Sequence, residues 1–407
     1  MATNSKNDVL LSLAKLIEKS REDIIKNNVI DLNSVSDEDI SMKDRLKVDN
    51  AKIEGMIKSL HDVASQSDPE GRVLYDYTRP DGLHIVNKTV PFGTILIIYE
   101  SRPDVTVEAA ATAFKAGNKI LLKGGRESLN TNLCLTKLWH EALHQNGFDT
   151  RFVQYLDISR QETQDLIKNN NRNIDLIIPR GGEALIEFVV NNSSVPVIIS
   201  GRGNNFIYVD DECSVDLAAQ LIINGKQRIS VCNAIDKVLI NKNIADLSNV
   251  VETFVDALNN CGVEVYSDSE TSTINKNIVA DDNQEVMYEE FLAPKMFFSI
   301  VENIDQAIET INKYSGGHSA VIATNNKEKA DKFMLEVDCA AVYHNASSRF
   351  TDGGQFGVGA EIAISTQKIH FRGPLGAQEL ITNKWFVYGE GHVRDQQPSA
   401  STSCNNA

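Results

Sequence analysis

The sequence predicts an α/β fold made of two doubly wound, mostly parallel sheets and a β arm. Three observations support this prediction. Residues 90–226 alternate apolar, strand-like runs with segments of helical periodicity. Residues after position 232 repeat the alternation on a smaller scale, and two β-prone segments, 72–90 and 367–388, lie outside both alternating regions. Strand–helix alternation of this kind is typical of parallel sheets covered by helices.

The first 70 residues predict packing helices. Residues 9–27 and 47–63 carry apolar side chains at helical spacing, and one face of the first segment holds Leu10, Leu13, Ala14 and Ile17. Residues 72–90 are β-prone and contain the turn sequence Arg-Pro-Asp-Gly at 79–82. We therefore expect a hairpin that projects from the first domain.

The first alternating region predicts a mostly parallel sheet. Its expected strands are residues 95–99, 119–122, 176–179, 195–199 and 205–209, and its expected helices are residues 107–116, 129–145, 161–170 and 183–191. In such sheets ligands bind at the carboxyl ends of the strands, and we expect a nucleotide there.

The second alternating region predicts a second α/β domain. Its expected elements are residues 237–240, 247–259, 295–301, 304–314 and 320–323. We assign residues 1–225 to a cofactor-binding domain with the hairpin arm at about 72–90, and residues 226–348 to a catalytic domain. Residues 349–366 are expected to return to the first domain and residues 367–395 to pair with the hairpin as an oligomerisation arm. The polar tail 396–407 is expected to be disordered.

Composition narrows the function. The formal net charge of −16 argues against a nucleic-acid partner, because phosphate backbones are bound by basic surfaces. No apolar run is long enough to span a bilayer and the N-terminus lacks a signal-peptide core, so we expect a cytoplasmic protein without a membrane partner. The six cysteines show neither metal-ligand spacing nor a paired framework, which favours reduced thiols and predicts no metal site.

Cys232 is the candidate nucleophile. It lies in the run Gln-Arg-Ile-Ser-Val-Cys-Asn-Ala (residues 227–234), between a polar turn and an apolar strand. A thiol attacks a carbonyl carbon as the thiolate, and backbone amides of a tight turn can lower its pKa and stabilise an oxyanion. The alternative is a buried structural cysteine, which is the commoner role of a single cysteine. The surrounding motifs have to decide between the two.

Several motifs occur in the order of one superfamily. They are VPFGT (90–94), YESRPDVT (99–106), AGNKILLKGG (116–125), IDLIIPRGG (174–182), EEFLAP (289–294), NASSRFTDG (345–353) and FGVGAEIAISTQKIHFRGP (356–374). With these motifs the chain resembles the aldehyde dehydrogenase superfamily from about residue 10 to about residue 394, and within it the gamma-glutamyl phosphate reductase (glutamate-5-semialdehyde dehydrogenase) family. The resemblance implies reduction of gamma-glutamyl phosphate by NADPH through a thioester on Cys232. That reaction is the second step of proline biosynthesis from glutamate.

The same resemblance implies cofactor contacts, although the dinucleotide signature G-x-G-x-x-G is absent after the first strands. In the resembled family the lysine that closes the second strand contacts the adenosine ribose, the glycines after it let the protein backbone approach the cofactor, and a later glutamate holds the nicotinamide ribose. The residues at these positions are Lys123, Gly124 and Gly125, then Arg180, Gly181 and Gly182 near the pyrophosphate, and Glu290. Ordinary turns and a solvated loop acid are the alternatives.

Substrate contacts are expected from the loops that carry matched motifs. Arg102 and Arg349 offer planar forks for a carboxylate or phosphate. Hydroxyl and acidic groups near them are Asp104, Ser347 and Thr351. Asp104 stands where many relatives have asparagine. Solvated loop side chains are the alternative for each of these residues.

Residues 197–208 lack the acid that activates water in hydrolytic aldehyde dehydrogenases, which favours acyl-phosphate reduction. This support is limited because the reductase family usually keeps an acid here, where this chain has Ile199, and a Cys-His pair where it has Asn205 and Phe206. A dehydrogenase for another semialdehyde or acyl phosphate, and a non-catalytic binding protein, remain the alternatives. The superfamily's exchanged arms imply a homo-oligomer, and the short-lived acyl phosphate motivates a transient complex with glutamate 5-kinase.

Overall fold

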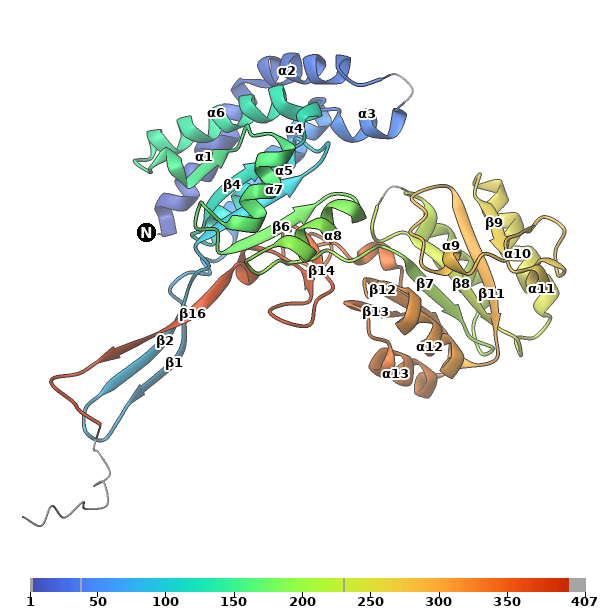
Figure 1. Ribbon diagram of the computed structural model, residues 1–407. Helices are drawn as coiled ribbons and strands as arrows, with labels where there is room; N and C mark the ends of the chain where they lie inside the picture. Colours follow the sequence, from blue (N-terminus) through green and yellow to red (C-terminus); the bar gives the residue numbers. More distant parts are fainter. Residues whose placement is uncertain (1–2, 37–38, 230, 395–407) are drawn as a thin grey trace, which may run out of the picture.

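The computed structural model describes residues 3–36, 39–229 and 231–394, and Figure 1 shows their arrangement. Two parallel sheets, each flanked by helices, lie side by side, and a long antiparallel arm extends from the first. The tail at 396–407, for which the sequence predicts disorder, lies outside the described residues.

The first sheet has four parallel strands in the order β5-β4-β3-β6. These are β3 (Thr94–Tyr99), β4 (Lys119–Lys123), β5 (Val153–Tyr155) and β6 (Leu176–Arg180). Side chains alternate between the two faces, so that Ile95 and Ile97 join one hydrophobic cluster whereas Leu96 and Ile98 join another. Apolar groups on both faces explain why each face is covered by helices.

Helices cover the two faces of the first sheet unequally. One cluster unites the sheet with the helices α1 (Thr3–Lys19), α2 (Arg21–Asn33), α4 (Asn50–Ser65), α5 (Val105–Lys115) and α6 (Leu129–Gln145), and α3 (Ile40–Leu46) follows α2. The other cluster contains residues of α7 (Arg160–Asn169) and α8 (Glu183–Asn192). The apolar stripe of Leu10, Leu13, Ala14 and Ile17 is buried as the sequence predicts. The helix expected at 9–27 is two helices, α1 and α2, which meet at Ser20.

The second sheet has seven parallel strands in the order β10-β9-β11-β8-β7-β12-β13. The strands are β7 (Asn205–Val209), β8 (Ile235–Asn241), β9 (Glu264–Ser267), β10 (Val279–Ala280), β11 (Lys295–Val301), β12 (Ser319–Ala323) and β13 (Ala341–His344). The accompanying helices are α9 (Val215–Lys226), α10 (Leu247–Asn260), α11 (Ser269–Ser272), α12 (Ile304–Tyr314) and α13 (Lys327–Glu336).

Two strand assignments made from the sequence are wrong. The strand at 205–209 was expected in the first sheet, but β7 pairs with β8 and β12 of the second. An apolar strand has the same pattern in either sheet, so its pattern does not reveal its partners. The strand expected at 195–199 makes only one bridge, from Val197 to Ile177. Pro196 in this run has no amide hydrogen for a sheet.

The arm is a three-stranded antiparallel sheet in the order β1-β2-β16. Its strands are β1 (Val73–Thr78), β2 (His84–Pro91) and β16 (Ile381–Tyr388), so the predicted pairing of the C-terminal segment with the hairpin is confirmed for residues 381–388. Residues 367–380 do not continue that strand. They include β15 (Gly373–Pro374), which pairs with β14 (Ile364–Ser365), and bury Leu375 and Leu380 against the first domain's core.

Candidate active site

Cys232 lies in a turn between α9 and β8, beside the amino ends of β7 and β8 in the second sheet. Arg180 ends β6 at the carboxyl edge of the first sheet and interacts electrostatically with the Cys232 thiol. The nucleophile therefore faces the edge of the first sheet at which parallel α/β folds bind ligands.

Asn205 holds the cysteine turn to the second sheet. It is fully buried, and its Nδ2 donates to the carbonyl oxygens of Cys232 (2.7 Å), Ala234 (2.6 Å) and Gly203 (3.0 Å). The Ser319 amide donates to its Oδ1 (3.0 Å). The sequence analysis gave Asn205 no role because relatives carry another residue at this position.

Asn233 fixes the other side of the turn. Its Nδ2 donates to the carbonyl oxygens of Arg349 (3.2 Å) and Thr351 (3.1 Å), and its own carbonyl accepts a hydrogen bond from Ser348 Oγ (2.7 Å). The NASSRFTDG segment, which follows β13, is thus attached directly to the residue after the nucleophile. The two segments are 115 or more residues apart in sequence, so no local pattern could reveal this contact.

The Cys232 side chain is exposed, which excludes the buried structural cysteine. Surrounding protein nevertheless raises the pKa of its thiol to about 11; Arg180 lowers it, Glu290 and Glu361 raise it, and Arg102 lowers it. The residue as a whole is exposed, whereas the pKa responds to all the protein around the sulfur atom. The expectation that turn amides lower this pKa is not met, because desolvation outweighs the nearby arginines.

Glu290 approaches the same turn across Gly203. A side chain at Gly203 would lie 2.2 Å from the Cys232 carbonyl oxygen and 2.6 Å from Glu290 Oε1, so only glycine permits this contact. Asp236 accepts a hydrogen bond from the amide after Glu290 (2.8 Å), and Lys237 Nζ donates to the carbonyl before it (2.8 Å). Desolvation and the charge of Asp236 raise the pKa of Glu290. The loop is held so that a carboxyl group faces the nucleophile's surroundings.

Lys123 ends β4, the second strand from β6 along the same carboxyl edge. Its Nζ donates to the Gly124 carbonyl oxygen (2.6 Å), and desolvation lowers its pKa. A side chain at Gly124 would meet Asn132 Nδ2 at 2.3 Å, and one at Gly125 would meet the Glu127 carboxylate at 2.0 Å. Close packing against Asn132, Tyr155 and Tyr99 therefore requires a glycine at position 124 even without a ligand, whereas at position 125 only the movable Glu127 carboxylate would have to shift.

Gly181 and Gly182 lead into α8, whose N-terminus was expected to face a pyrophosphate. In this structure the Gly182 amide donates to Glu100 Oε2 (2.9 Å), and a side chain at Gly181 would lie 2.5 Å from the same oxygen. A carboxylate of the YESRPDVT segment thus occupies the position predicted for a cofactor anion. Sequence reasoning missed Glu100, because a single acid in a loop is ordinarily solvated.

The expected substrate residues separate into two groups. Arg349 interacts electrostatically with Cys232, and its guanidinium group donates a hydrogen bond to Oδ1 of Asn233, the residue after Cys232. Arg102 also lies within electrostatic range of Cys232. Ser347 and Thr351 are instead buried and bonded internally, Ser347 Oγ to Asn224 (2.6 Å) and Thr351 Oγ1 to Ser319 (2.8 Å) and Tyr343 (2.6 Å). These bonds argue against direct substrate contact by either hydroxyl.

Asp104 is not a free loop acid. It precedes α5 and lies 3.5 Å from Lys52 Nζ of α4, so its charge is paired within the first domain. It also lies within electrostatic range of Glu108, one turn further along the helix, and of Arg180. Asp104 therefore shapes the charge of the region and is not exposed to accept a substrate.

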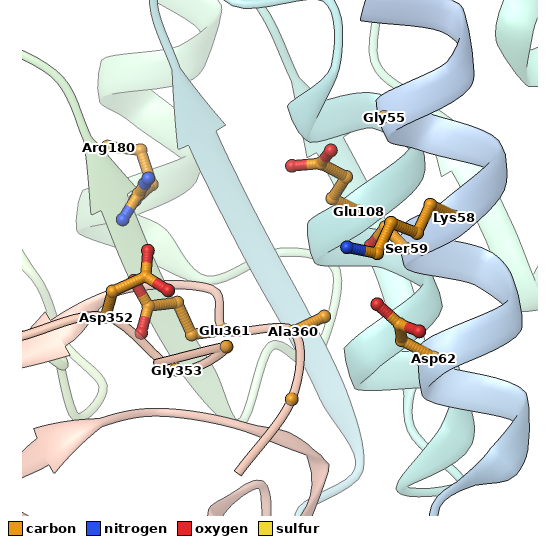
Figure 2. Close-up of a pocket in the computed structure, with 12 residues that line it drawn as sticks. Gly55, Lys58, Ser59, Asp62, Glu108, Arg180, Asp352, Gly353, Ala360 and Glu361 are labelled. Atoms are coloured by element: carbon orange, nitrogen blue, oxygen red, sulfur yellow. The ribbon is translucent and has the colours of Figure 1, made fainter. Parts of the chain in front are cut away.

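A cavity of about 290 Å³ opens beside Arg180, between α4, α5 and the segment 352–361 (Figure 2). Its lining residues are Gly55, Lys58, Ser59, Asp62, Glu108, Arg180, Asp352, Gly353, Gly354, Gly359, Ala360 and Glu361. In Figure 2 the guanidinium of Arg180 lies beside the carboxyl groups of Asp352 and Glu361, and the carboxyl group of Glu108 lies across the cavity, near Lys58 and Ser59. From the sequence alone, Glu361 is one residue of a longer motif and Glu108 is one residue of a predicted helix, so neither indicates a site.

The aldehyde dehydrogenase family profile matches residues 1–277 and 271–360. A gamma-glutamyl phosphate reductase from Clostridium perfringens (strain 13 / Type A) is 42% identical over 400 residues, covering 97% of this chain and 95% of the relative. One from Dictyoglomus thermophilum is also 42% identical and covers the same shares. The crystal structure of gamma-glutamyl phosphate reductase from Thermotoga maritima superimposes with a TM-score of 0.90 at 41% identity, over 97% of this chain and 95% of that one.

The chain therefore belongs to the aldehyde dehydrogenase family. Within it, the full-length relatives place it among the gamma-glutamyl phosphate reductases, which confirms the resemblance found in the sequence and the predicted fold class. An acetylating aldehyde dehydrogenase from Geobacillus thermoglucosidasius, 16% identical with a TM-score of 0.69, shares the fold. Among the described residues, no helix has the length and apolar character needed to cross a membrane.

Proposed function

We propose that this protein reduces gamma-glutamyl phosphate to glutamate 5-semialdehyde and phosphate, with NADPH as reductant, in proline biosynthesis. The observation that carries the proposal is the exposed Cys232 thiol at the meeting of the two sheets, with Glu290 behind Gly203 on one side and Arg180 on the other. The full-length similarity to gamma-glutamyl phosphate reductases supports the same assignment.

The chemistry begins with loss of the Cys232 thiol proton, which Arg180 and Arg102 favour and desolvation opposes. The thiolate attacks the acyl carbon, the bond from carbon to phosphate oxygen breaks, and phosphate leaves. Bound NADPH supplies the hydride that reduces the resulting thioester. The carbon–sulfur bond then breaks, and the aldehyde departs while the Cys232 thiolate is regenerated.

Several residues fit the cofactor. Glu290, partly buried beside the cysteine turn, suits two ribose hydroxyl donors. Lys123 and the N-terminus of α8 lie on the carboxyl edge of the first sheet. We propose that they contact the cofactor together with the glycines that follow β4 and β6, namely Gly124, Gly125, Gly181 and Gly182. Arg180 lines the cavity next to Glu361, so we assign it to the substrate and not to the pyrophosphate.

Phosphate dependence tests this function. In the reverse direction, glutamate 5-semialdehyde and NADP should give steady NADPH formation only with phosphate, because residues 197–208 contain no acid to activate water against the thioester. Without phosphate, NADPH should stop at about one equivalent per site. Steady phosphate-independent turnover would instead assign a hydrolytic aldehyde dehydrogenase, and no NADPH with or without phosphate would favour a binding protein.

We further propose that the arm joins copies of this chain into a homo-oligomer. Many large apolar side chains of the arm are exposed, namely Val73, Leu74, Tyr75, Tyr77, Trp385, Val387 and Tyr388. A monomer rarely exposes so many large apolar side chains on one small sheet. Light scattering on the intact protein and on a Trp385→Ser variant tests this proposal, and a monomeric intact protein would contradict it.

A transient complex with glutamate 5-kinase is proposed because the acyl phosphate is reactive and short-lived. Such a complex would pass the acyl phosphate on before water reaches it. During turnover of both enzymes, less free acyl phosphate should accumulate with the intact protein than with a variant that keeps its own turnover but lacks the surface contacts to the kinase. Equal release in the two mixtures would exclude the complex as a protective device.

A further inference from the structure

The cavity beside Arg180 combines acidic and basic groups. Its charged lining residues are the acids Asp62, Glu108, Asp352 and Glu361 and the bases Lys58 and Arg180. When all of these groups are ionised the acids exceed the bases by two, and in that state the cavity repels a phosphate or a dianion. It suits a zwitterionic group, because cations and anions both find partners there.

Two of the four acids are available for a ligand. Asp352 Oδ1 already accepts a hydrogen bond from the Gln355 amide (3.1 Å), and Asp62 is exposed on α4. Glu108 and Glu361 form no ion pair within the part of the chain that the structure describes. Glu361 Oε2 is buried and finds no hydrogen-bond partner among the described residues. A buried carboxylate oxygen without a partner is destabilising until a donor binds to it.

Arg180 is also available to bind a ligand. It forms no ion pair with any described residue, although Asp104 and Glu361 both lie within electrostatic range. It also interacts with the Cys232 thiol, so one extended molecule can reach from Cys232 past Arg180 into the cavity. A guanidinium group without a carboxylate partner suits the planar carboxylate of a ligand.

We propose that Glu108 and Glu361 bind the α-ammonium group of the γ-glutamyl substrate while Arg180 faces its α-carboxylate. This inference rests on the proposed function, because the acyl carbon attacked by Cys232 fixes the other end of the molecule. The ammonium group supplies the hydrogen-bond donors that Glu361 Oε2 lacks. The excess of acid keeps the phosphate end outside the cavity, toward Cys232 and Arg349. Glu108 and Glu361 would thus favour a substrate that carries an α-amino group over an otherwise identical substrate that lacks it.

A comparison of two substrates tests the proposal. The wild-type protein and the double variant Glu108→Gln/Glu361→Gln are assayed in the reverse direction with glutamate 5-semialdehyde and with 5-oxopentanoate, which lacks only the α-amine. Wild type should prefer the amino substrate at least about tenfold in kcat/KM, since hydrogen bonds to charged groups are among the stronger ones. The double variant should prefer it less than about threefold. Glu141→Gln, an exposed change on α6, should behave like wild type.

A second readout does not require turnover. Alkylation of Cys232 by iodoacetamide is followed in the presence of L-glutamate or of glutarate, which differ only in the amine. L-Glutamate should protect Cys232 of wild type better than glutarate does, and the difference should disappear in the double variant. Circular dichroism spectra that match wild type would show that the double variant is folded.

The outcomes separate the two hypotheses. Phosphate-dependent turnover by wild type with equal use of both substrates would overturn the ammonium site and leave the reductase function standing. Absent turnover combined with amine-dependent protection of Cys232 would contradict the function and support the site. An amine preference that persists in the double variant, in either assay, would also overturn the site.

Discussion

The cysteine turn and the cavity beside Arg180 are neighbours, but their polar groups differ in whether they have partners within the described protein. Around Cys232, Asn205 and Asn233 bond the backbone carbonyls of the turn and of the segment after β13. In the cavity, Glu361 Oε2 has no partner among the described residues and Glu108 has no ion pair there. Groups that must hold one position are satisfied by the fold, whereas groups that bind a ligand are left to be satisfied by it.

Replacement of Cys232 should have the largest effect on turnover. Cys232→Ser should lower kcat by at least about 10³-fold, because a serine hydroxyl is a poor nucleophile without a base beside it. Titration of NADPH binding by fluorescence should show nearly unchanged affinity, since the turn's carbonyl hydrogen bonds remain. Alanine replacements of Cys134, Cys213, Cys261 and Cys339, made singly, are the controls and should keep activity. A second essential cysteine would contradict the assignment.

The next largest effect should come from Asn205, which holds the turn but touches no substrate. Asn205→Ala should lower kcat by about 10- to 100-fold, because small displacements of a nucleophile are costly. It should also change the rate of Cys232 alkylation by iodoacetamide, a readout of the turn itself. The free energy of unfolding should fall by about 1 to 3 kcal/mol as buried partners lose their bonds.

Asn241→Ala is the matched control for Asn205. Asn241 is also buried and donates to Tyr208 Oη (2.8 Å), but it ends β8 far along the strand from the cysteine turn. This variant should lose comparable stability while the alkylation rate of Cys232 stays at the wild-type value. Equal effects of the two variants on alkylation would mean that Asn205 acts only through global stability.

The sequence predicted the parallel α/β class and the pairing of the arm, because these depend on local periodicity and on motifs. It did not place β7, since an apolar strand such as Asn205–Val209 fits either sheet. Neither the hydrogen bonds of Asn205 nor the cavity that Glu108 and Glu361 both line could be predicted. Both depend on contacts between segments far apart in the chain, and Glu108 appears locally as a helical residue. Ser347 and Thr351 were assigned to the substrate because sequence does not show which way a hydroxyl points.

The cavity's unsatisfied acids should make stability depend on pH. Burial raises the pKa of both Glu108 and Glu361 from 4.5 to about 7, with further increases from Asp104 and Asp352 respectively, while Arg180 opposes both shifts. Lys52 and Arg102 also lower the pKa of Glu108, and a hydrogen bond from the Gly353 backbone lowers the pKa of Glu361. Between pH 4.5 and about pH 7 the two acids are ionised in the unfolded chain but protonated in the folded protein. Proton binding therefore stabilises the folded protein at low pH, and this contribution to the free energy of unfolding is lost as pH rises through about 7.

The double variant Glu108→Gln/Glu361→Gln cannot ionise at these positions. Its Tm should match that of wild type near pH 5 and exceed it by about 2 °C or more at pH 8. Differential scanning calorimetry across this range measures the difference. Parallel Tm curves for the two proteins would show that cations already neutralise the carboxylates and that the cavity is not unsatisfied.

The smallest effect should come from Glu100, which represents a third case between the two regions compared. Its carboxylate accepts a hydrogen bond from the Gly182 amide at the start of α8, where the sequence predicts a cofactor anion. A bound cofactor would have to displace this carboxylate from the Gly182 amide. Glu100→Gln keeps a hydrogen-bond acceptor but removes the competing charge. The apparent KM for NADPH should fall by about two- to fivefold, as expected for one charge at a helix N-terminus, and the fall should shrink at high salt. An increase in KM would show instead that Glu100 supports the cofactor loop and that the anion binds elsewhere.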